Sequence, residues 1–170
     1  MGALVPLSPA AAAPAAAQST HVLVVTGLGG APEYSRAFAE WGRELVEAAE
    51  RAGVPGSNVV WLAESSVEAA SAVSRREAVV DAVGSLGARS APGDLVVVAL
   101  FGHGSARGDE VRLNLPGPDL TAGGLAALLD PLSDRRVVVV NAASASGGFV
   151  EPLSAPGRVV ITATRSTREN

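Results

Sequence analysis

Short apolar runs rich in valine and leucine recur along the chain after residue 20. Their length and β-branched composition are typical of strands that are buried on both faces of a sheet. The runs span residues 21–26, 58–63, 95–101, 136–140 and 158–163. A different pattern occupies residues 110–115, where polar and apolar side chains alternate, and it predicts one strand of a small exposed hairpin.

Segments with helical periodicity lie between these runs. Between residues 36 and 52, apolar side chains recur every three or four positions and charged residues occupy the opposite side, which predicts an amphipathic helix. Its expected apolar side comprises Ala37, Phe38, Trp41, Leu45, Ala48, Ala49 and Ala52. Ser74–Glu77 has the pattern of a capping box and predicts the start of a second helix. Thr121 is the expected N-cap of a third, short helix.

Strands that are apolar throughout and that alternate with amphipathic helices indicate an α/β protein. We expect a three-layer fold with a mostly parallel sheet and helices on both faces. A chain of 170 residues suits one compact domain. Ligands in such folds bind at the carboxyl ends of the strands, so the informative loops are residues 27–30, 102–105 and 141–148.

Composition and charge exclude several classes of function. The net charge is −4, and the thirteen cationic residues form no basic patch in the sequence, so a nucleic-acid partner is not expected. The chain contains no cysteine, which excludes a disulfide, a thiolate metal site and a cysteine nucleophile. With only two histidines, His21 and His103, the sequence carries no signal for a metal site, and we expect no cofactor.

The first twenty residues carry no charge and contain three prolines. Ala15–Ala17 followed by Gln18 fits the small-residue rule of a signal peptidase site. We therefore expect residues 1–17 to be a signal-like segment, residues 18–170 to be the mature domain, and the protein to be exported to the periplasm or secreted. The alternative is a disordered tail rich in alanine and proline. The segment is too short and too interrupted by proline to span a bilayer, so no integral membrane segment is expected in the mature chain.

Two loops carry residues that are suited to catalysis. His103 directly follows the predicted strand 95–101 between Gly102 and Gly104, a position in which an imidazole can serve as a general base. The alternative is a turn histidine without a chemical role. Ser144 and Ser146 follow the strand 136–140 and are candidate nucleophiles, with backbone N–H groups around Gly147 as an oxyanion site. The alternative there is a turn of small residues.

Other enzyme classes fit the sequence poorly. An α/β-hydrolase needs its histidine after the nucleophile, and no histidine follows His103. A dinucleotide-binding loop at Gly27–Gly30 would have Pro32 in the place of its third glycine. A phosphate-binding loop of the P-loop type needs a lysine, which the chain lacks. Nucleotide binding by Gly27–Gly30 therefore stays a distant alternative.

Two motifs together resemble the legumain-like branch of the caspase-like cysteine peptidases. LVVVALFGHGS at residues 95–105 is similar to the family's strand that ends in a His-Gly motif. VVVVNAASASGGF at residues 137–149 is similar to the next strand, which ends in an E-A-C-E-S-G-S type stretch. The segments around Tyr34–Arg36 and VVITATRSTREN at the end of the chain also look similar, so the resemblance covers residues 21–170.

The resemblance implies a caspase-like topology and a set of site residues. His103 takes the place of the catalytic base, and Gly102, Gly104 and Ser146 take places at the oxyanion and substrate site. Arg36 lies where the family has substrate-pocket residues. The family usually continues into another helix and specificity loops, so the resemblance also implies a domain that is incomplete at its C-terminus.

The family's nucleophilic cysteine is replaced in this chain. Alignment on the following Ser-Gly puts Ser144 in its place, and alignment on the end of the strand puts Ala143 there. We therefore expect a peptidase homologue that has lost cysteine chemistry and that binds a peptide or protein in a cleft between His103 and Ser144. The alternative is an active hydrolase with Ser144 as nucleophile, His103 as base and the Gly104 N–H as oxyanion donor. Both versions require the His103 and Ser144 side chains to approach within about 7 Å.

Overall fold

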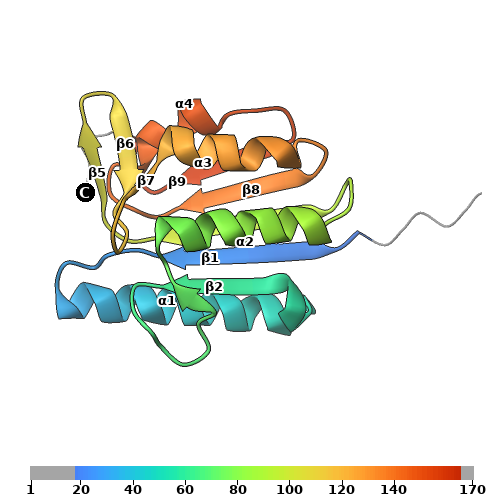
Figure 1. The fold of residues 1–170 in the computed structure, drawn as a ribbon, viewed down its shortest axis with the longest axis horizontal. Helices are drawn as coiled ribbons and strands as arrows, with labels where there is room; N and C mark the ends of the chain where they lie inside the picture. Colours follow the sequence, from blue (N-terminus) through green and yellow to red (C-terminus); the bar gives the residue numbers. More distant parts are fainter. Residues whose placement is uncertain (1–17, 166–170) are drawn as a thin grey trace, which may run out of the picture.

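The protein is built around a parallel β-sheet of six strands (Figure 1). A computed structural model describes residues 18–165, so the signal-like segment 1–17 lies outside the described residues. In chain order the strands are β1 (Thr20–Thr26), β2 (Val59–Ala63), β3 (Ala72–Val73), β4 (Leu95–Phe101), β8 (Arg136–Asn141) and β9 (Arg158–Thr162). They lie in the order β3-β2-β1-β4-β8-β9, and every neighbouring pair is parallel. The carboxyl ends of all six strands therefore point to one edge of the sheet.

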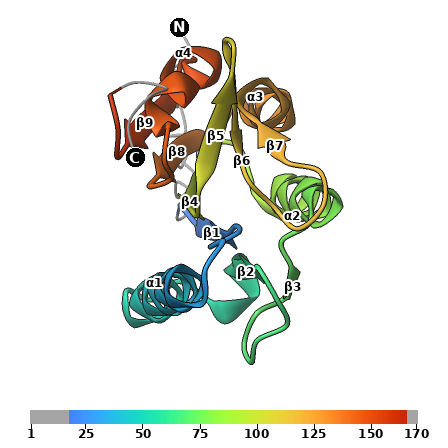
Figure 2. The same ribbon diagram turned by 90° about the vertical axis from the view of Figure 1, so that its left-hand side faces the viewer.

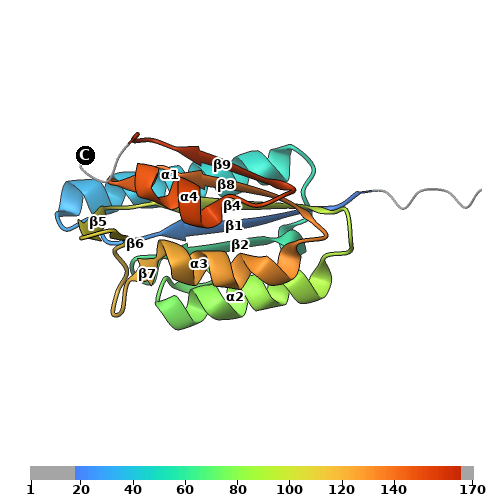
Figure 3. The same cartoon turned by 90° about the horizontal axis from the view of Figure 1, so that it is seen from above.

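Helices cover both faces of this sheet (Figures 2 and 3). The helices are α1 (Pro32–Arg51), α2 (Arg76–Arg89), α3 (Ala122–Leu129) and α4 (Val150–Leu153), with short 3₁₀ turns η1 (Gly56–Asn58), η2 (Asp130–Leu132) and η3 (Ser146–Phe149). Helix α1 lies on one face over β1 and β2, and the other three helices lie on the opposite face. The expected three-layer α/β architecture is confirmed. Among residues 18–165, no helix has both the length and the apolar character that crossing a membrane would need.

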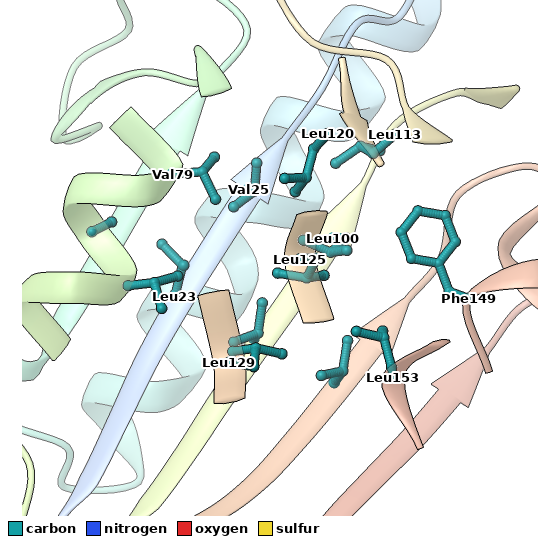
Figure 4. Close-up of a cluster of buried hydrophobic side chains, with 14 of the residues drawn as sticks. Leu23, Val25, Val79, Leu100, Leu113, Leu120, Leu125, Leu129, Phe149 and Leu153 are labelled. Atoms are coloured by element: carbon teal, nitrogen blue, oxygen red, sulfur yellow. The ribbon is translucent and has the colours of Figure 1, made fainter. Parts of the chain in front are cut away.

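The main hydrophobic core lies between the sheet and helices α2, α3 and α4 (Figure 4). Its labelled members are Leu23, Val25, Val79, Leu100, Leu113, Leu120, Leu125, Leu129, Phe149 and Leu153, all of them almost fully buried. Full burial of each leucine contributes about 1.5–3 kcal/mol relative to an exposed side chain. A smaller cluster on the α1 face contains Val22, Val24, Trp61 and Ala63. These two clusters pack against the two faces of the sheet and so stabilise the framework that carries the loops at its carboxyl edge.

A small antiparallel sheet lies at that edge of the main sheet. It consists of β5 (Gly104–Arg107), β6 (Glu110–Leu113) and β7 (Leu120–Thr121). The expected hairpin is confirmed, although its apolar positions Val111 and Leu113 are buried in the core rather than exposed. The backbone N–H of Leu28 donates to the Asn114 carbonyl at 2.9 Å, which ties the hairpin to the loop after β1.

The capping-box prediction at Ser74–Glu77 is wrong. Helix α2 begins at Arg76, and its N-cap residue Arg75 makes no capping hydrogen bond through its side chain. The buried Ser74 hydroxyl instead donates to the Thr26 carbonyl at 2.7 Å, so it joins the start of α2 to the end of β1. By contrast, the expected cap at Thr121 is confirmed, because its hydroxyl accepts from the Gly124 N–H at 3.0 Å.

A buried polar pair lies at the opposite edge of the sheet, where the strands begin. His21 Nε2 is 3.3 Å from Asp94 Oδ2, and the Asp94 carboxylate also accepts the backbone N–H groups of Ala91 at 2.8 Å and Ser19 at 2.9 Å. The hydrogen bond from Ala91, followed by that from Ser19, holds the pKa of Asp94 below its ordinary value. His21 acts in the same direction, and burial of the carboxylate partly opposes the effect.

We expect the folded state to lose stability in acid through Asp94. Since the pKa of Asp94 is lower in the folded than in the unfolded state, its contribution is complete above the unfolded value of about 4 and disappears as the pH falls through the folded value. Urea unfolding of wild type and Asp94→Asn between about pH 7 and pH 3 measures this contribution. The variant should be less stable at neutral pH and lose less on acidification. The exposed Asp81→Asn is the control, and identical pH profiles for Asp94→Asn and wild type would contradict the prediction.

Candidate functional site

His103 and Ser144 meet at the carboxyl edge of the sheet. His103 follows β4 and Ser144 follows β8, and these strands are parallel neighbours that pair from Leu95–Arg136 to Leu100–Asn141. The two side chains are partly buried, and His103 Nδ1 lies 3.4 Å from the Ser144 hydroxyl. The expected proximity is confirmed, whereas the chemical role of the pair stays a prediction.

Two glycines allow the chain to pass closely on either side of His103. Gly102 has a φ of +152° and is buried, and an added Cβ would lie 3.2 Å from the Gly27 backbone. A Cβ on Gly104 would lie only 2.0 Å from the Ser144 carbonyl oxygen. The glycine at position 104 therefore lets the loop that carries Ser144 approach the strand that follows His103.

The backbone N–H of Gly104 points away from the hairpin ladder. Asn114 N donates to His103 O at 2.9 Å, and the register pairs Gly104 with Leu113. Hydrogen-bonded and non-hydrogen-bonded pairs alternate in an antiparallel ladder, so Gly104 belongs to a non-hydrogen-bonded pair. Its N–H is therefore directed to the side opposite β6. This orientation suits the expected oxyanion donor.

The side chain that faces His103 comes from Ser144 and not from Ala143. Ala143 is only 1% exposed, and its methyl group packs in the main core. The Asn141 side-chain oxygen accepts the Ala143 N–H at 3.0 Å and fixes the turn after β8. Ala145 then adopts a left-handed conformation with φ of 56°, which costs a non-glycine residue about 1–2 kcal/mol. Of these two residues, only Ser144 therefore presents its side chain to His103.

Ser146 and Gly147 do not face the hollow as the sequence suggested. Ser146 is fully buried, and its hydroxyl accepts the Thr164 N–H at 3.1 Å. The Gly147 N–H donates to the Thr164 hydroxyl at 3.0 Å. The expected oxyanion site around Gly147 is therefore wrong, because this N–H is already bound. Both residues anchor the serine loop to the end of β9.

Arg36 and the glycine loop lie beside this pair without joining it. Arg36 is exposed, its Nε donates to the Pro32 carbonyl at 3.3 Å, and it lines a separate hollow with Glu64. Within the loop 27–30, the Gly27 N–H donates to Phe101 O at 2.7 Å and the Leu28 N–H is bound as described above. Two of the N–H groups that a phosphate would need are thus occupied, which counts against nucleotide binding.

An open hollow of about 260 Å³ lies between His103, Ser144, the start of α1 and the end of β9. Tyr34, Phe38 and Trp41 form its wall on the side of α1. The helical pattern predicts Phe38 and Trp41 on the apolar, buried side of this helix, but Trp41 is 45% exposed. The spacing of three aromatic residues along one helix, directly after a candidate ligand loop, was the signal for this wall. No cluster of three or more metal-ligating side chains occurs within residues 18–165.

The comparisons with known proteins support the fold alone. No family model matches the chain, and no curated protein matches it. Among solved structures, the chain is similar to the crystal structure of protein GSU0716 from Geobacter sulfurreducens, with a TM-score of 0.55 and 17% sequence identity. The match covers 74% of this chain and 50% of the other, so the chain spans about half the length of that neighbour.

Proposed function

We propose that this protein is a homologue of the legumain-like, caspase-like peptidases that binds a peptide segment in the hollow between His103 and Ser144. The observation that carries the proposal is the contact of 3.4 Å between His103 Nδ1 and the Ser144 hydroxyl in an open hollow. The resemblance puts the family's imidazole base at His103, and one of its two alignments puts the cysteine thiol at Ser144. The hairpin and the short helix α3 between β4 and β8 support the proposal, because the resemblance implies a hairpin and a short helix between these two strands.

Binding without cleavage is the version that the local chemistry favours. A serine hydroxyl is a much weaker nucleophile than a thiolate and needs a well-aligned base. Among residues 18–165, no carboxylate hydrogen-bonds the His103 ring. The ring is instead packed edge-on against Tyr34 and Phe38. Within the described residues, the imidazole therefore has no acidic partner of the kind that holds a histidine in its reactive tautomer in serine hydrolases.

A Ser–His hydrolase is the second candidate, and the orientation of the Gly104 N–H favours it. In that reaction, the Ser144 oxygen would attack a carbonyl carbon while His103 accepts the hydroxyl proton. The tetrahedral oxyanion would accept a hydrogen bond from the Gly104 N–H. His103 would then return the proton to the leaving group, and water would release the acyl group from Ser144.

A serine-reactive fluorophosphonate separates the two candidates. If the protein only binds peptides, the folded wild type should be labelled no faster than the urea-unfolded chain. Peptide binding measured by calorimetry should then survive Ser144→Ala. Rapid labelling that disappears in both Ser144→Ala and His103→Ala would instead establish the hydrolase. Ser65→Ala, a substitution away from the hollow, is the matched control.

We also propose that the protein is exported. The basis is the sequence pattern of Ala15–Ala17 before Gln18, which fits a signal peptidase site. When the full chain is expressed in a bacterial host, N-terminal sequencing of the exported fraction should begin at Gln18. Recovery of only the uncleaved chain from the cytoplasm would contradict this proposal.

A further inference from the structure

Three aromatic side chains of α1 form one wall of the hollow beside His103 and Ser144. Tyr34, Phe38 and Trp41 are spaced four and three residues apart, so they share one side of the helix. Tyr34 is 50% exposed and Trp41 is 45% exposed, whereas Phe38 between them is buried. The wall therefore presents large apolar surface to whatever enters the hollow.

The aromatic rings of this wall pack against each other and against neighbouring rings. The Tyr34 and Phe38 rings pack edge-on against the His103 ring. Their centroids lie 5.1 Å and 5.5 Å, respectively, from the centroid of the imidazole. Trp41 continues the series, because its ring centroid lies 5.5 Å from that of Phe38 and 6.0 Å from that of Phe101. Aromatic pairs in such edge-on or tilted arrangements are favourable. These mutual contacts hold the wall in place before a ligand arrives, which reduces the entropy lost on binding.

The opposite wall is small and uncharged. It is formed by Ala142 after β8 and by Ala163 and Thr164 after β9. Within the described part of the chain, His103 is the one titratable side chain besides Tyr34 that lines the hollow, and Arg36 lies in the separate hollow with Glu64. Within the described residues, no arginine, aspartate or glutamate lines the hollow, so the lining itself is largely apolar and favours an uncharged side chain.

We infer that the hollow accepts a bulky, uncharged, apolar side chain of a peptide, such as that of phenylalanine. This inference rests on the proposed function, because it names the class of ligand for the same site. A phenyl group can pack between the exposed rings of Tyr34 and Trp41 and the alanines of the opposite wall. A ligand side chain in the hollow lies next to His103 and Ser144. The hollow therefore determines which peptides bind beside these two residues.

The test uses three blocked peptides that differ at one residue: acetyl-Ala-Ala-Phe-Ala-amide and its alanine and aspartate counterparts. Their affinities for the full chain are measured by calorimetry. We expect the phenylalanine peptide to bind about tenfold more tightly than either of the others, which corresponds to about 1.4 kcal/mol. Equal affinities, or a preference for aspartate that Arg36→Gln removes, would overturn the inference and leave the proposed function standing. No binding of any of the three would overturn the proposed function as well.

Two substitutions assign the preference to the aromatic wall. Trp41→Ala and Tyr34→Ala both remove half-exposed rings, and each should lower the affinity for the phenylalanine peptide towards that of the alanine peptide. The affinity for the alanine peptide should fall by a smaller factor, so the preference for phenylalanine narrows in both variants. Val80→Ala is the matched control, because Val80 is a half-exposed apolar residue on α2, which covers the opposite face of the sheet. If neither aromatic variant changes the preference for phenylalanine, the wall is not its origin and the inference fails.

Discussion

Ser144→Cys should convert this chain into a protein that a thiol-directed electrophile such as iodoacetamide labels rapidly. The wild type has no cysteine, so all labelling of the variant reports the new thiol. The Ser144 hydroxyl lies 3.4 Å from His103 Nδ1, so a sulfur atom at this position would be within reach of the imidazole. A neighbouring protonated imidazole favours the thiolate, which is the reactive form of cysteine.

The size of the effect follows from the thiolate fraction. An unperturbed thiol has a pKa of about 8.5, and lowering it by one unit raises the thiolate fraction at pH 7 about tenfold. Because a thiolate of lower pKa is also a weaker nucleophile, we expect labelling about threefold faster than that of the unfolded variant. Adding His103→Ala should remove the excess. Ala143→Cys is the control for the other alignment and should react slowly, because the side chain at this position is 1% exposed. If labelling of Ser144→Cys does not depend on His103, the imidazole does not act on this position.

Gly104→Ala should destabilise the fold and disrupt the site together. The added methyl carbon would lie 2.0 Å from the Ser144 carbonyl oxygen and 3.1 Å from the Arg112 carbonyl oxygen. Both are backbone atoms, so the clash cannot be relieved by a side-chain rotation. Overpacking of this kind typically costs about 1–3 kcal/mol. The serine loop must also shift away from His103, so the His103-dependent labelling of Ser144→Cys should be lost in the double variant.

Gly123→Ala is the matched control for this substitution. Gly123 lies in α3, and no atom would lie within 4 Å of an added Cβ. Because alanine is the better helix former by up to about 1 kcal/mol, stability should stay the same or rise slightly. Urea unfolding gives the free energy of unfolding for both variants. If Gly104→Ala is as stable as Gly123→Ala, the close approach of the serine loop to Gly104 is not a constraint on the fold.

The main sheet could be predicted from the sequence because short apolar runs rich in β-branched residues mark its strands. The run at residues 95–101 coincides with β4, and the runs at 136–140 and 158–163 differ from β8 and β9 by one residue each. Strands buried on both faces need apolar side chains at every position, so their composition is distinctive. The expected burial on both faces is wrong for the edge strand β9, where Val159 and Ile161 are 54% and 52% exposed. The parallel arrangement followed from the helices that connect them.

Elements without such a pattern could not be predicted. Strand β5 (Gly104–Arg107) is short and largely polar, and its partner β6 alone determines its extent. The local sequence around Ser74 fits a capping box. In the folded protein, however, the Ser74 hydroxyl donates a hydrogen bond to the Thr26 carbonyl instead. A long-range contact of this kind decides the use of the hydroxyl, and the local sequence does not contain it.

The site could be predicted in part for a similar reason. His103 and Ser144 follow adjacent apolar runs, and parallel strands bring such positions to one edge. The exposed rings of Tyr34 and Trp41 were missed because aromatic residues at helical spacing look the same whether they face a core or a hollow. Helix α1 begins at Pro32, immediately after the loop that follows β1. Its first turns therefore lie beside the strand ends, where the sheet no longer covers them.

Proton NMR of the two histidine rings is the most direct test of peptide binding at this site. His103 lies in the hollow, and His21 is 2% exposed at the opposite edge of the sheet, so the chain contains its own control. His103→Ala assigns the signals. On titration with acetyl-Ala-Ala-Phe-Ala-amide, we expect the His103 ring signals to shift and saturate while those of His21 stay in place. His103 signals that do not move at saturating peptide, or equal shifts of both rings, would contradict a binding site between His103 and Ser144.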